Sequence, residues 1–241
     1  MKMLLLIPVL LFTFLLNAQD LTGSWKLVKA NEMPVTDKQI VRIYQDGYFA
    51  EAAKNAKTNE FLWTRGGTYS PVNYAELLDF DTQNKEAIGT THDFELTFLD
   101  DGRAKFKKGP EEQIWERISG AKNELSGNWV ITGRMRNGEM NTMTPGDRRT
   151  IKILGGDRFQ WVAFNSATGE FFGTGGGTYT AQDGKYIENI DFFSRDNSRA
   201  GASLEFNYEV KDDQWHHSGK SSKGDPMQEI WSPYAQAYQK N

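Results

Sequence analysis

A segment of 15 residues occurs twice in the chain, and this repeat constrains the fold more than any other feature. Residues 55–69 read NAKTNEFLWTRGGTY, and residues 165–179, 110 positions later, read NSATGEFFGTGGGTY. In each copy, two strand-like runs flank a polar turn, which is typical of a β-hairpin. The Gly-Gly-Thr-Tyr motif falls in the second run, where glycine permits a bulge or a close backbone approach. The repeat therefore predicts a chain built from two related halves.

Further matches extend the repeat over most of the chain. Leu21-Thr-Gly-Ser-Trp25 corresponds to Leu125-Ser-Gly-Asn-Trp129, and Gln113-Ile-Trp115 corresponds to Glu229-Ile-Trp231. The offset between matching residues grows from 104 to 116 along the chain. The second copy therefore carries insertions, and these fall where turn residues cluster, as a shared scaffold tolerates. We infer a tandem duplication, with a linker at residues 119–123.

Both units show the alternation of β-strands and no convincing amphipathic helix, apart from a candidate short one at residues 233–238. Val41-Arg-Ile-Tyr44 and Phe94-Glu-Leu-Thr-Phe98 alternate apolar with polar residues, and pairs such as Asp46-Gly47 lie between such runs as turns. Many short strands suit a sandwich or a barrel, and a barrel is favoured because closure removes exposed edges. The predicted fold is all-β, with two tandem antiparallel barrels of about eight strands each, at 19–118 and 124–235.

Residues 1–18 are predicted to be a signal peptide. Lys2 precedes a largely apolar run that ends at Leu16, and the small residue Ala18 stands where cleavage is expected. The run is shorter than the roughly 20 residues that span a bilayer, which argues against stable membrane insertion after cleavage, although a retained anchor stays an alternative. We expect an exported protein of the periplasm, the cell envelope or the extracellular space.

Composition excludes several classes of function. The chain has no cysteine, so it has neither disulfides nor thiol chemistry. Its formal net charge is −4 and no block of basic residues stands out, which argues against nucleic acid and anionic membrane surfaces as partners. His216 and His217 are neighbours on a predicted strand and point to opposite faces, and His92 stands alone. We therefore predict no catalytic residue, no metal and no cofactor.

The motifs at the ends of each unit resemble those of a known group of barrels. A Gly-x-Trp motif on the first strand and an Ile-Trp pair on the closing strand are similar to the lipocalin-like barrels of the calycin group. More narrowly, the chain resembles exported lipocalin-like proteins of Bacteroidetes. The resemblance implies that Trp25 closes one end of its barrel beneath Arg117. It implies the same place for Trp129, although Ser232 and Pro233 follow the second Ile-Trp pair and supply no basic residue.

One strand face is the same in both units and supplies the main candidate site. Residues 74–80 carry Tyr, Glu, Leu and Phe at alternate positions, and residues 186–192 carry Tyr, Glu, Ile and Phe. A face of this composition reads as interior. On the other face, only Asp79 and Asp191 match. The buried glutamates are interpreted either as polar anchors for a ligand or as partners of an arginine or of backbone amides, with general acid catalysis as a third alternative.

The loop after the first strand of each unit is the second candidate. Met33, Met140 and Met143 lie there and suit an apolar ligand, although ordinary loop packing is an equal alternative. A copper(I) site that includes Met135 is a weaker possibility. The predicted ligand-binding residues are Phe49, Tyr69, Tyr74, Glu76, Phe80, Phe159, Tyr179, Tyr186, Glu188, Phe192, Met140 and Met143.

Three functions follow as hypotheses. The leading one is non-enzymatic binding of a small, largely apolar molecule in one or both barrels. The second is a cell-envelope protein-interaction module whose barrels are filled by their own side chains, as eight-stranded barrels can be. The third is an isomerase- or cyclase-type enzyme. The oligomeric state is not predicted.

Overall fold

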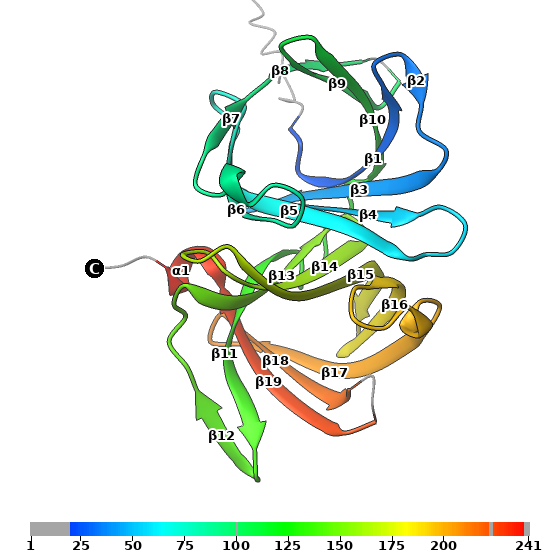
Figure 1. Ribbon diagram of the computed structural model, residues 1–241. Coiled ribbons are helices and arrows are strands. Elements are labelled where there is room, and N and C mark those ends of the chain that lie inside the picture. The colour runs from blue at the N-terminus through cyan, green and yellow to red at the C-terminus, as the bar shows by residue number, and fades with distance from the viewer. Residues whose placement is uncertain (1–19, 100, 222–223, 239–241) are drawn as a thin grey trace, which may run out of the picture.

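The computed structural model describes residues 20–99, 101–221 and 224–238, and these form two antiparallel barrels (Figure 1). The predicted fold class is confirmed. The signal peptide predicted at 1–18 lies outside the described residues. Among the residues that are described, no helix is long and apolar enough to cross a membrane.

The first sheet follows the strand order β7-β6-β5-β4-β3-β1-β10-β9-β8, and the short β2 pairs with β1. The barrel is nearly closed, because β7 and β8 are separated only by Phe94 and pair with opposite ends of the sheet. Its strands are β1 (Gly23–Ala30), β2 (Met33–Pro34), β3 (Lys38–Gln45), β4 (Tyr48–Asn55), β5 (Phe61–Ser70), β6 (Ala75–Asp81), β7 (Thr91–Asp93), β8 (Glu95–Phe98), β9 (Arg103–Lys108) and β10 (Glu111–Ser119).

The second sheet closes on itself, because β11 pairs with both β13 and β19. A single strand, β17, takes the place of β7 and β8, and β12 forms a hairpin with the end of β11 (Figure 1). The strands are β11 (Gly127–Arg136), β12 (Glu139–Thr142), β13 (Arg148–Gly155), β14 (Arg158–Asn165), β15 (Glu170–Gln182), β16 (Lys185–Phe193), β17 (Ser203–Lys211), β18 (Gln214–Lys220) and β19 (Pro226–Pro233). Three short helices are described, η1 (Lys85–Ala87), η2 (Asn197–Arg199) and α1 (Tyr234–Ala237).

The cross-strand pairing matches the two barrels position by position. Trp25 is opposite Arg42 in the first barrel, and Trp129 is opposite Lys152 in the second. Continuing around each sheet in the same way identifies the interior positions that correspond. The matched positions, with the first-barrel residue before the second-barrel residue, include Arg42/Lys152, Tyr44/Leu154, Glu51/Trp161, Ala53/Ala163, Trp63/Gly173, Glu76/Glu188, Phe106/His217 and Gln113/Glu229.

The repeated glycines form a β-bulge in each barrel, as expected. The pairing register shifts within Gly66-Gly67 against β6 and within Gly176-Gly177 against β16. A Cβ on Gly67 would lie 1.9 Å from the Leu77 carbonyl oxygen, so no other residue fits there without a shift of backbone. The glycines are therefore explained by close backbone approach.

The bulge removes Phe80 and Phe192 from the interior face on which they were predicted. Each bulge inserts one residue, so side chains beyond it point the other way. Phe80 packs on Phe164 of the second barrel, with ring centroids 4.8 Å apart, and Phe192 stacks on Phe61 of the first barrel at 6.0 Å. The prediction was wrong for both residues, because strict alternation holds only along an unbroken ladder.

The two barrels pack through a shared apolar cluster and through reciprocal polar contacts. Ser24 Oγ donates to Asp157 Oδ1 at 3.4 Å, and the Asn128 backbone N–H donates to Asp46 Oδ2 at 3.2 Å. Ser24 and Asn128 are matched positions, so equivalent parts of the two units touch each other's turns, as in a two-fold symmetric dimer. The buried cluster between them contains Ile43, Tyr48, Ala50, Phe80, Val130, Ile151, Ile153, Val162 and Phe164.

The interface also explains why one aspartate was kept on the otherwise diverged strand face. The Tyr48 hydroxyl donates to Asp79 at 2.9 Å, and Arg158 Nη1 donates to Asp191 at 2.8 Å. Each aspartate also lies 3.9 Å from a cation of the other barrel, Arg149 for Asp79 and Lys54 for Asp191. These aspartates therefore serve the contact between the barrels.

The tryptophans at the barrel ends differ as the sequence indicated. The Trp25 indole N–H donates to the Leu21 carbonyl at 2.7 Å, and the Arg117 guanidinium lies 4.3 Å above its ring. Trp129 makes the same bond to Leu125, at 2.9 Å, but Pro233 is opposite it on β19. Trp129 packs edge-on against Trp215 instead, with ring centroids 5.9 Å apart.

Candidate functional site

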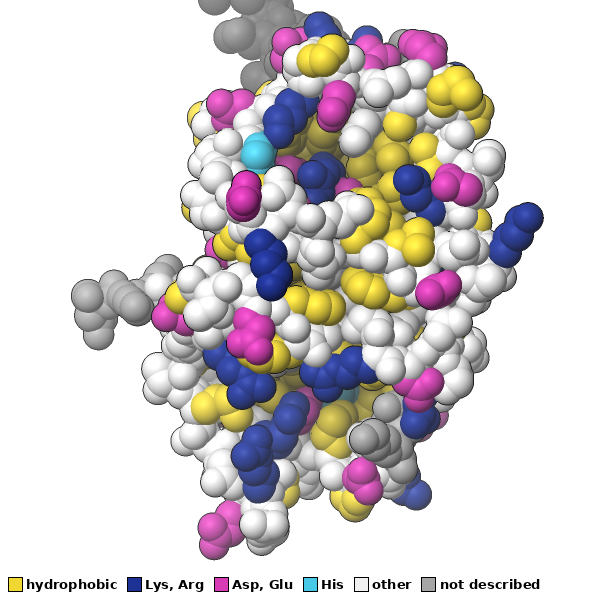
Figure 2. Space-filling view, in the orientation of Figure 1, with side chains coloured by type: hydrophobic (Ala, Val, Ile, Leu, Met, Phe, Trp, Pro, Cys, Tyr) yellow, Lys and Arg dark blue, Asp and Glu magenta, His cyan; other side chains and the backbone are white. Residues whose placement is uncertain are grey.

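The barrels enclose cavities of different size. Figure 2 shows a hollow in each barrel on the same face of the molecule. The hollow of the second barrel is a cavity of about 410 Å3, whereas that of the first is about 110 Å3. Pockets for small organic ligands occupy roughly 300–1,000 Å3. The second cavity is therefore the candidate functional site.

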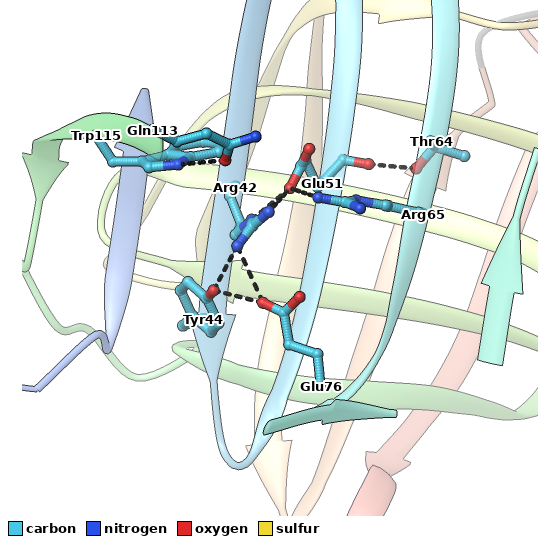
Figure 3. Close-up of polar contacts among 8 residues, drawn as sticks. All are labelled: Arg42, Tyr44, Glu51, Thr64, Arg65, Glu76, Gln113 and Trp115. Carbon is cyan, nitrogen blue, oxygen red and sulfur yellow. Dashed lines mark hydrogen bonds and ion pairs between the residues drawn. The ribbon is translucent and has the colours of Figure 1, made fainter. Parts of the chain in front are cut away.

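In the first barrel, a buried ionic network occupies the interior (Figure 3). Arg42 forms ion pairs with Glu51 and with Glu76, the latter at 3.0 Å, and it donates to the Tyr44 hydroxyl at 2.7 Å. The Tyr44 hydroxyl in turn donates to Glu76 at 2.6 Å. The Arg42 guanidinium also lies 4.5 Å above the ring of Trp115. The polar groups of these four side chains, Arg42, Tyr44, Glu51 and Glu76, thus satisfy one another without a ligand.

The charges in this network support each other despite burial. Burial disfavours the ionised form of Glu51, but the guanidinium groups of Arg42 and Arg65 outweigh it and lower the Glu51 pKa. Burial also raises the pKa of Tyr44 well above its usual range, so its hydroxyl stays protonated and remains a donor. Of the three interpretations of Glu76, the structure shows the pairing with an arginine.

The matching network in the second barrel is smaller. Lys152 Nζ donates to Glu188 Oε1 at 2.7 Å, and the Tyr186 hydroxyl donates to the same oxygen at 2.9 Å. Tyr186 comes from β16, whereas Tyr44, which makes this bond in the first barrel, comes from β3 at the position that matches Leu154. The two barrels therefore supply the same bond from different strands. Rings of Phe159, Tyr186, Trp215 and Trp231 surround the ammonium group at 5.2–5.9 Å.

Exchanges at matched interior positions account for the larger cavity. Arg42 with its two carboxylates becomes Lys152 with one, because Glu51 is replaced by Trp161. Trp63 packs against the core of the first barrel, and the position that matches it is Gly173. The apolar lining of the cavity so produced includes Trp161, Ala163, Phe172, Ile190, Phe193, Ala202, Leu204, Phe206, Met227 and Trp231.

A histidine without hydrogen bonds lies in the wall of this cavity. His217 is 2% exposed, and neither of its ring nitrogens has a hydrogen-bond partner among the described residues. Its Nδ1 lies 3.6 Å from Glu229 Oε2, which is longer than a hydrogen bond. Burial lowers the pKa of His217 despite the nearby carboxylates, so the imidazole is neutral at pH 7. His217 therefore presents a free polar group to whatever occupies the cavity.

Glu229, the neighbour of His217, is held ionised. Arg134 donates to Glu229 Oε1 from Nη2 at 2.6 Å, and the Trp231 indole donates to Oε2 at 3.1 Å. Burial acts to raise the pKa of Glu229, but contact with His217 and the Arg134 guanidinium outweighs it and lowers this pKa to about 2. Position 229 matches Gln113, so this charge is present in the second barrel only.

Most of the predicted ligand-binding residues do not line the large cavity. Glu188 lines it, and Glu76 lines the small cavity of the first barrel. Tyr186 is fully buried behind Glu188. Phe49, Phe159 and Tyr179 are buried in the barrel cores, and Tyr69 packs at the edge of the first core.

The remaining predicted residues lie elsewhere. Tyr74 stands in the turn before β6 with a φ of 49°. Phe80 and Phe192 lie between the barrels, as described above. Met140 and Met143 are each 39% exposed and do not line the large cavity. Among the described residues, no group of three or more His, Asp or Glu side chains is placed to bind a metal ion.

Sequence reasoning missed the polar residues that line the cavity. Lys152, His217 and Glu229 come from three different strands, and Arg134 from a fourth. One signal was present in the sequence, because aligning the closing strands at Trp115 and Trp231 places Glu229 against Gln113. The sequence predicts that His216 and His217 point to opposite faces of a strand. Only the sheet register shows that the face of His217 is the interior one.

Comparison with family models finds a match over part of the chain. Residues 124–238 match the model of a family described as "Domain of unknown function (DUF4488)", which covers the second barrel. A search among curated proteins finds no match.

Proposed function

We propose that the chain is an exported binding protein of the lipocalin-like type, which holds a small, largely apolar molecule in its second barrel. The observation that carries this proposal is the cavity of about 410 Å3. Its walls are mostly aromatic and aliphatic, with a few convergent polar groups, which is the usual composition of a small-molecule site. The signal peptide predicted at 1–18 supports the exported location.

The first barrel is assigned a structural role. Its interior is occupied by Arg42 and its partners, and Trp63 fills the position that Gly173 leaves open in the second barrel. Its outer face supplies half of the contact between the barrels. This barrel fits the hypothesis of a side-chain-filled module, whereas the second fits a carrier.

An isomerase- or cyclase-type enzyme is the second candidate, and His217 is the observation that favours it. A neutral imidazole free of hydrogen bonds, in a cavity beside Glu188 and Glu229, has the chemistry of a general base. A carrier returns its ligand unchanged. An enzyme returns an isomer, which chromatography of the extracted ligand before and after incubation with fresh protein would separate.

The proposal is tested by native mass spectrometry of the mature chain, purified after export and compared with its denatured mass. We expect an extra mass of a few hundred daltons on the native protein. The control is Ala163→Phe, which places a ring in the cavity and should yield a bare mass. A bare wild-type mass that stays bare after incubation with a lipid extract of the host, or an adduct that survives in Ala163→Phe, would contradict the proposal.

A further inference from the structure

The mouth of the second cavity is positively charged, although the whole chain carries a formal net charge of −4. Figure 2 shows Lys and Arg side chains gathered around the hollow of the C-terminal barrel. The cations that line this cavity outnumber its carboxylates by five to two. They are Arg134, Arg148, Lys152, Arg195 and Arg199, against Glu188 and Glu229. A local excess of this kind on an acidic protein indicates an anionic ligand group.

Two of these cations lack a carboxylate. Lys152 is paired with Glu188, Arg134 with Glu229 and Arg199 with Asp196. By contrast, Arg148 and Arg195 form no ion pair with any described residue. Arg148 lies 4.5 Å above the ring of Phe172, and Arg195 donates from Nε to the Phe172 carbonyl at 2.7 Å. Both guanidinium groups are therefore gathered at Phe172, on one side of the mouth, and both keep N–H donors for a ligand.

The first barrel does not share this feature. Lys38 matches Arg148, since each faces the asparagine that ends the next strand, Asn55 or Asn165. By the offset of β6 and β16, the position of Arg195 corresponds to Gln83. The two arginines without an ion pair, Arg148 and Arg195, thus occur only in the barrel that has the large cavity.

We propose that the ligand of the second barrel is an amphipathic organic anion. Its apolar body lies against Trp161, Phe206 and Trp231, and its carboxylate, phosphate or sulfonate group lies at the mouth on Arg148 and Arg195. Guanidinium groups bind such oxyanions through paired N–H donors, and a charge-assisted bond of this kind is stronger than a neutral one. This assignment rests on the proposed binding function and adds the chemical class of the ligand.

A matched pair of fluorescent probes tests the assignment. Anilinonaphthalene sulfonate and N-phenyl-naphthylamine share one apolar body and differ in the sulfonate. We expect the wild-type protein to bind the sulfonate more tightly, with an affinity that falls as salt is added. The double variant Arg148→Gln/Arg195→Gln should bind the sulfonate about tenfold or more weakly and the neutral amine unchanged. Lys38→Gln, at the matched position of the first barrel, is the control and should alter neither affinity.

Each outcome has a separate meaning. Equal binding of both probes, or no loss of sulfonate binding in the double variant, would overturn the anionic class and leave the binding function standing. No binding of either probe, with Ala163→Phe indistinguishable from wild type, would remove the binding function and this assignment together. Displacement of the bound sulfonate by decanoate but not by decyl phosphate would identify the head group as a carboxylate, and the reverse result a phosphate.

Discussion

The two barrels share one scaffold and differ in what fills it. Matched tryptophans, the same glycine bulge and a glutamate on the same interior position show the common frame. In the first barrel Arg42 meets two carboxylates and a tyrosine, and little space remains. In the second, Trp161 and Gly173 replace Glu51 and Trp63, and a cavity opens. Once a tandem duplication has supplied two barrels, one of them can stabilise the assembly while the other is free to bind.

The largest difference between the barrels is expected from removing the central cation. Arg42→Met leaves Glu51 with only the part-exposed Arg65 and Glu76 with only the Tyr44 hydroxyl. Breaking two buried ion pairs in this way costs about 3–5 kcal/mol of unfolding free energy. Lys152→Met leaves one carboxylate, still hydrogen-bonded by Tyr186 beside an open cavity, so we expect about 1–3 kcal/mol. Denaturant unfolding followed by circular dichroism measures both. An equal or larger cost for Lys152→Met would contradict the comparison.

The second-largest difference in unfolding free energy is expected when a phenylalanine is placed in the interior of each barrel. Ala53 is fully buried, so Ala53→Phe overpacks the first core and costs about 1–3 kcal/mol. The matched Ala163 faces the cavity, so Ala163→Phe should change the unfolding free energy by less than about 0.5 kcal/mol. It should also abolish binding of N-phenyl-naphthylamine, which Ala53→Phe retains. Thermal unfolding and probe fluorescence give both readouts, and a destabilised Ala163→Phe would mean that the cavity is not open.

The pH dependence of stability should differ at the matched pair Phe106/His217. Burial, aided by the nearby charge of Lys152, lowers the pKa of His217 in the folded protein below its ordinary value of 6.5 and outweighs the opposing carboxylates of Glu229 and Glu188. Below pH 6.5 the unfolded chain therefore binds a proton that the folded chain does not. Stability from this group is complete above that pH and is lost as pH falls toward the folded pKa.

His217→Phe, which installs the residue of the first barrel, should remove the part of the pH dependence that His217 contributes and leave the smaller part due to His92, whose pKa burial also lowers. The measurement is the denaturation midpoint at about pH 7.5 and about pH 5.5, a window that lies above the pKa of unfolded glutamate and so excludes Glu229. His216→Gln, on the other face of the strand, is the control and should keep the wild-type dependence. A wild-type midpoint that does not fall between the two pH values would contradict the neutral buried state of His217.

The smallest effect is expected at the end of the first barrel. Arg117 lies over Trp25 and donates to the Thr22 carbonyl at 2.6 Å, and the second barrel has no counterpart. The guanidinium is half-buried, so Arg117→Met should cost about 1 kcal/mol of unfolding free energy. Thermal unfolding measures this change. An unchanged unfolding free energy would mean that Arg117 stabilises the first barrel no more than Pro233 stabilises the second.

The sequence was sufficient for the architecture and for part of the site. Duplication, strand alternation and turn chemistry predicted two antiparallel barrels, because each rests on local patterns that repeat. Glu76 and Glu188 were placed inside correctly, since alternation holds along that part of the strand. Phe80 and Phe192 were placed wrongly, because a single inserted residue at the bulge reverses the face and leaves no clear mark in the pattern of apolar residues.

The rest of the site depends on pairings across the sheet. Lys152, His217 and Glu229 meet only because β13, β18 and β19 curl into one barrel, and no local spacing relates them. Arg195 lies between strand and helix, where no periodicity fixes the direction of a side chain. The contrast between Trp63 and Gly173, which decides the size of the cavity, becomes visible only when the two registers are compared.

A crystal structure of the protein with N-phenyl-naphthylamine would test the central claim most directly. The account predicts one probe molecule per chain, inside the second barrel between Trp161 and Trp231, with the first barrel unchanged around Arg42. Density for the probe in the first barrel, or between the two barrels, would contradict it.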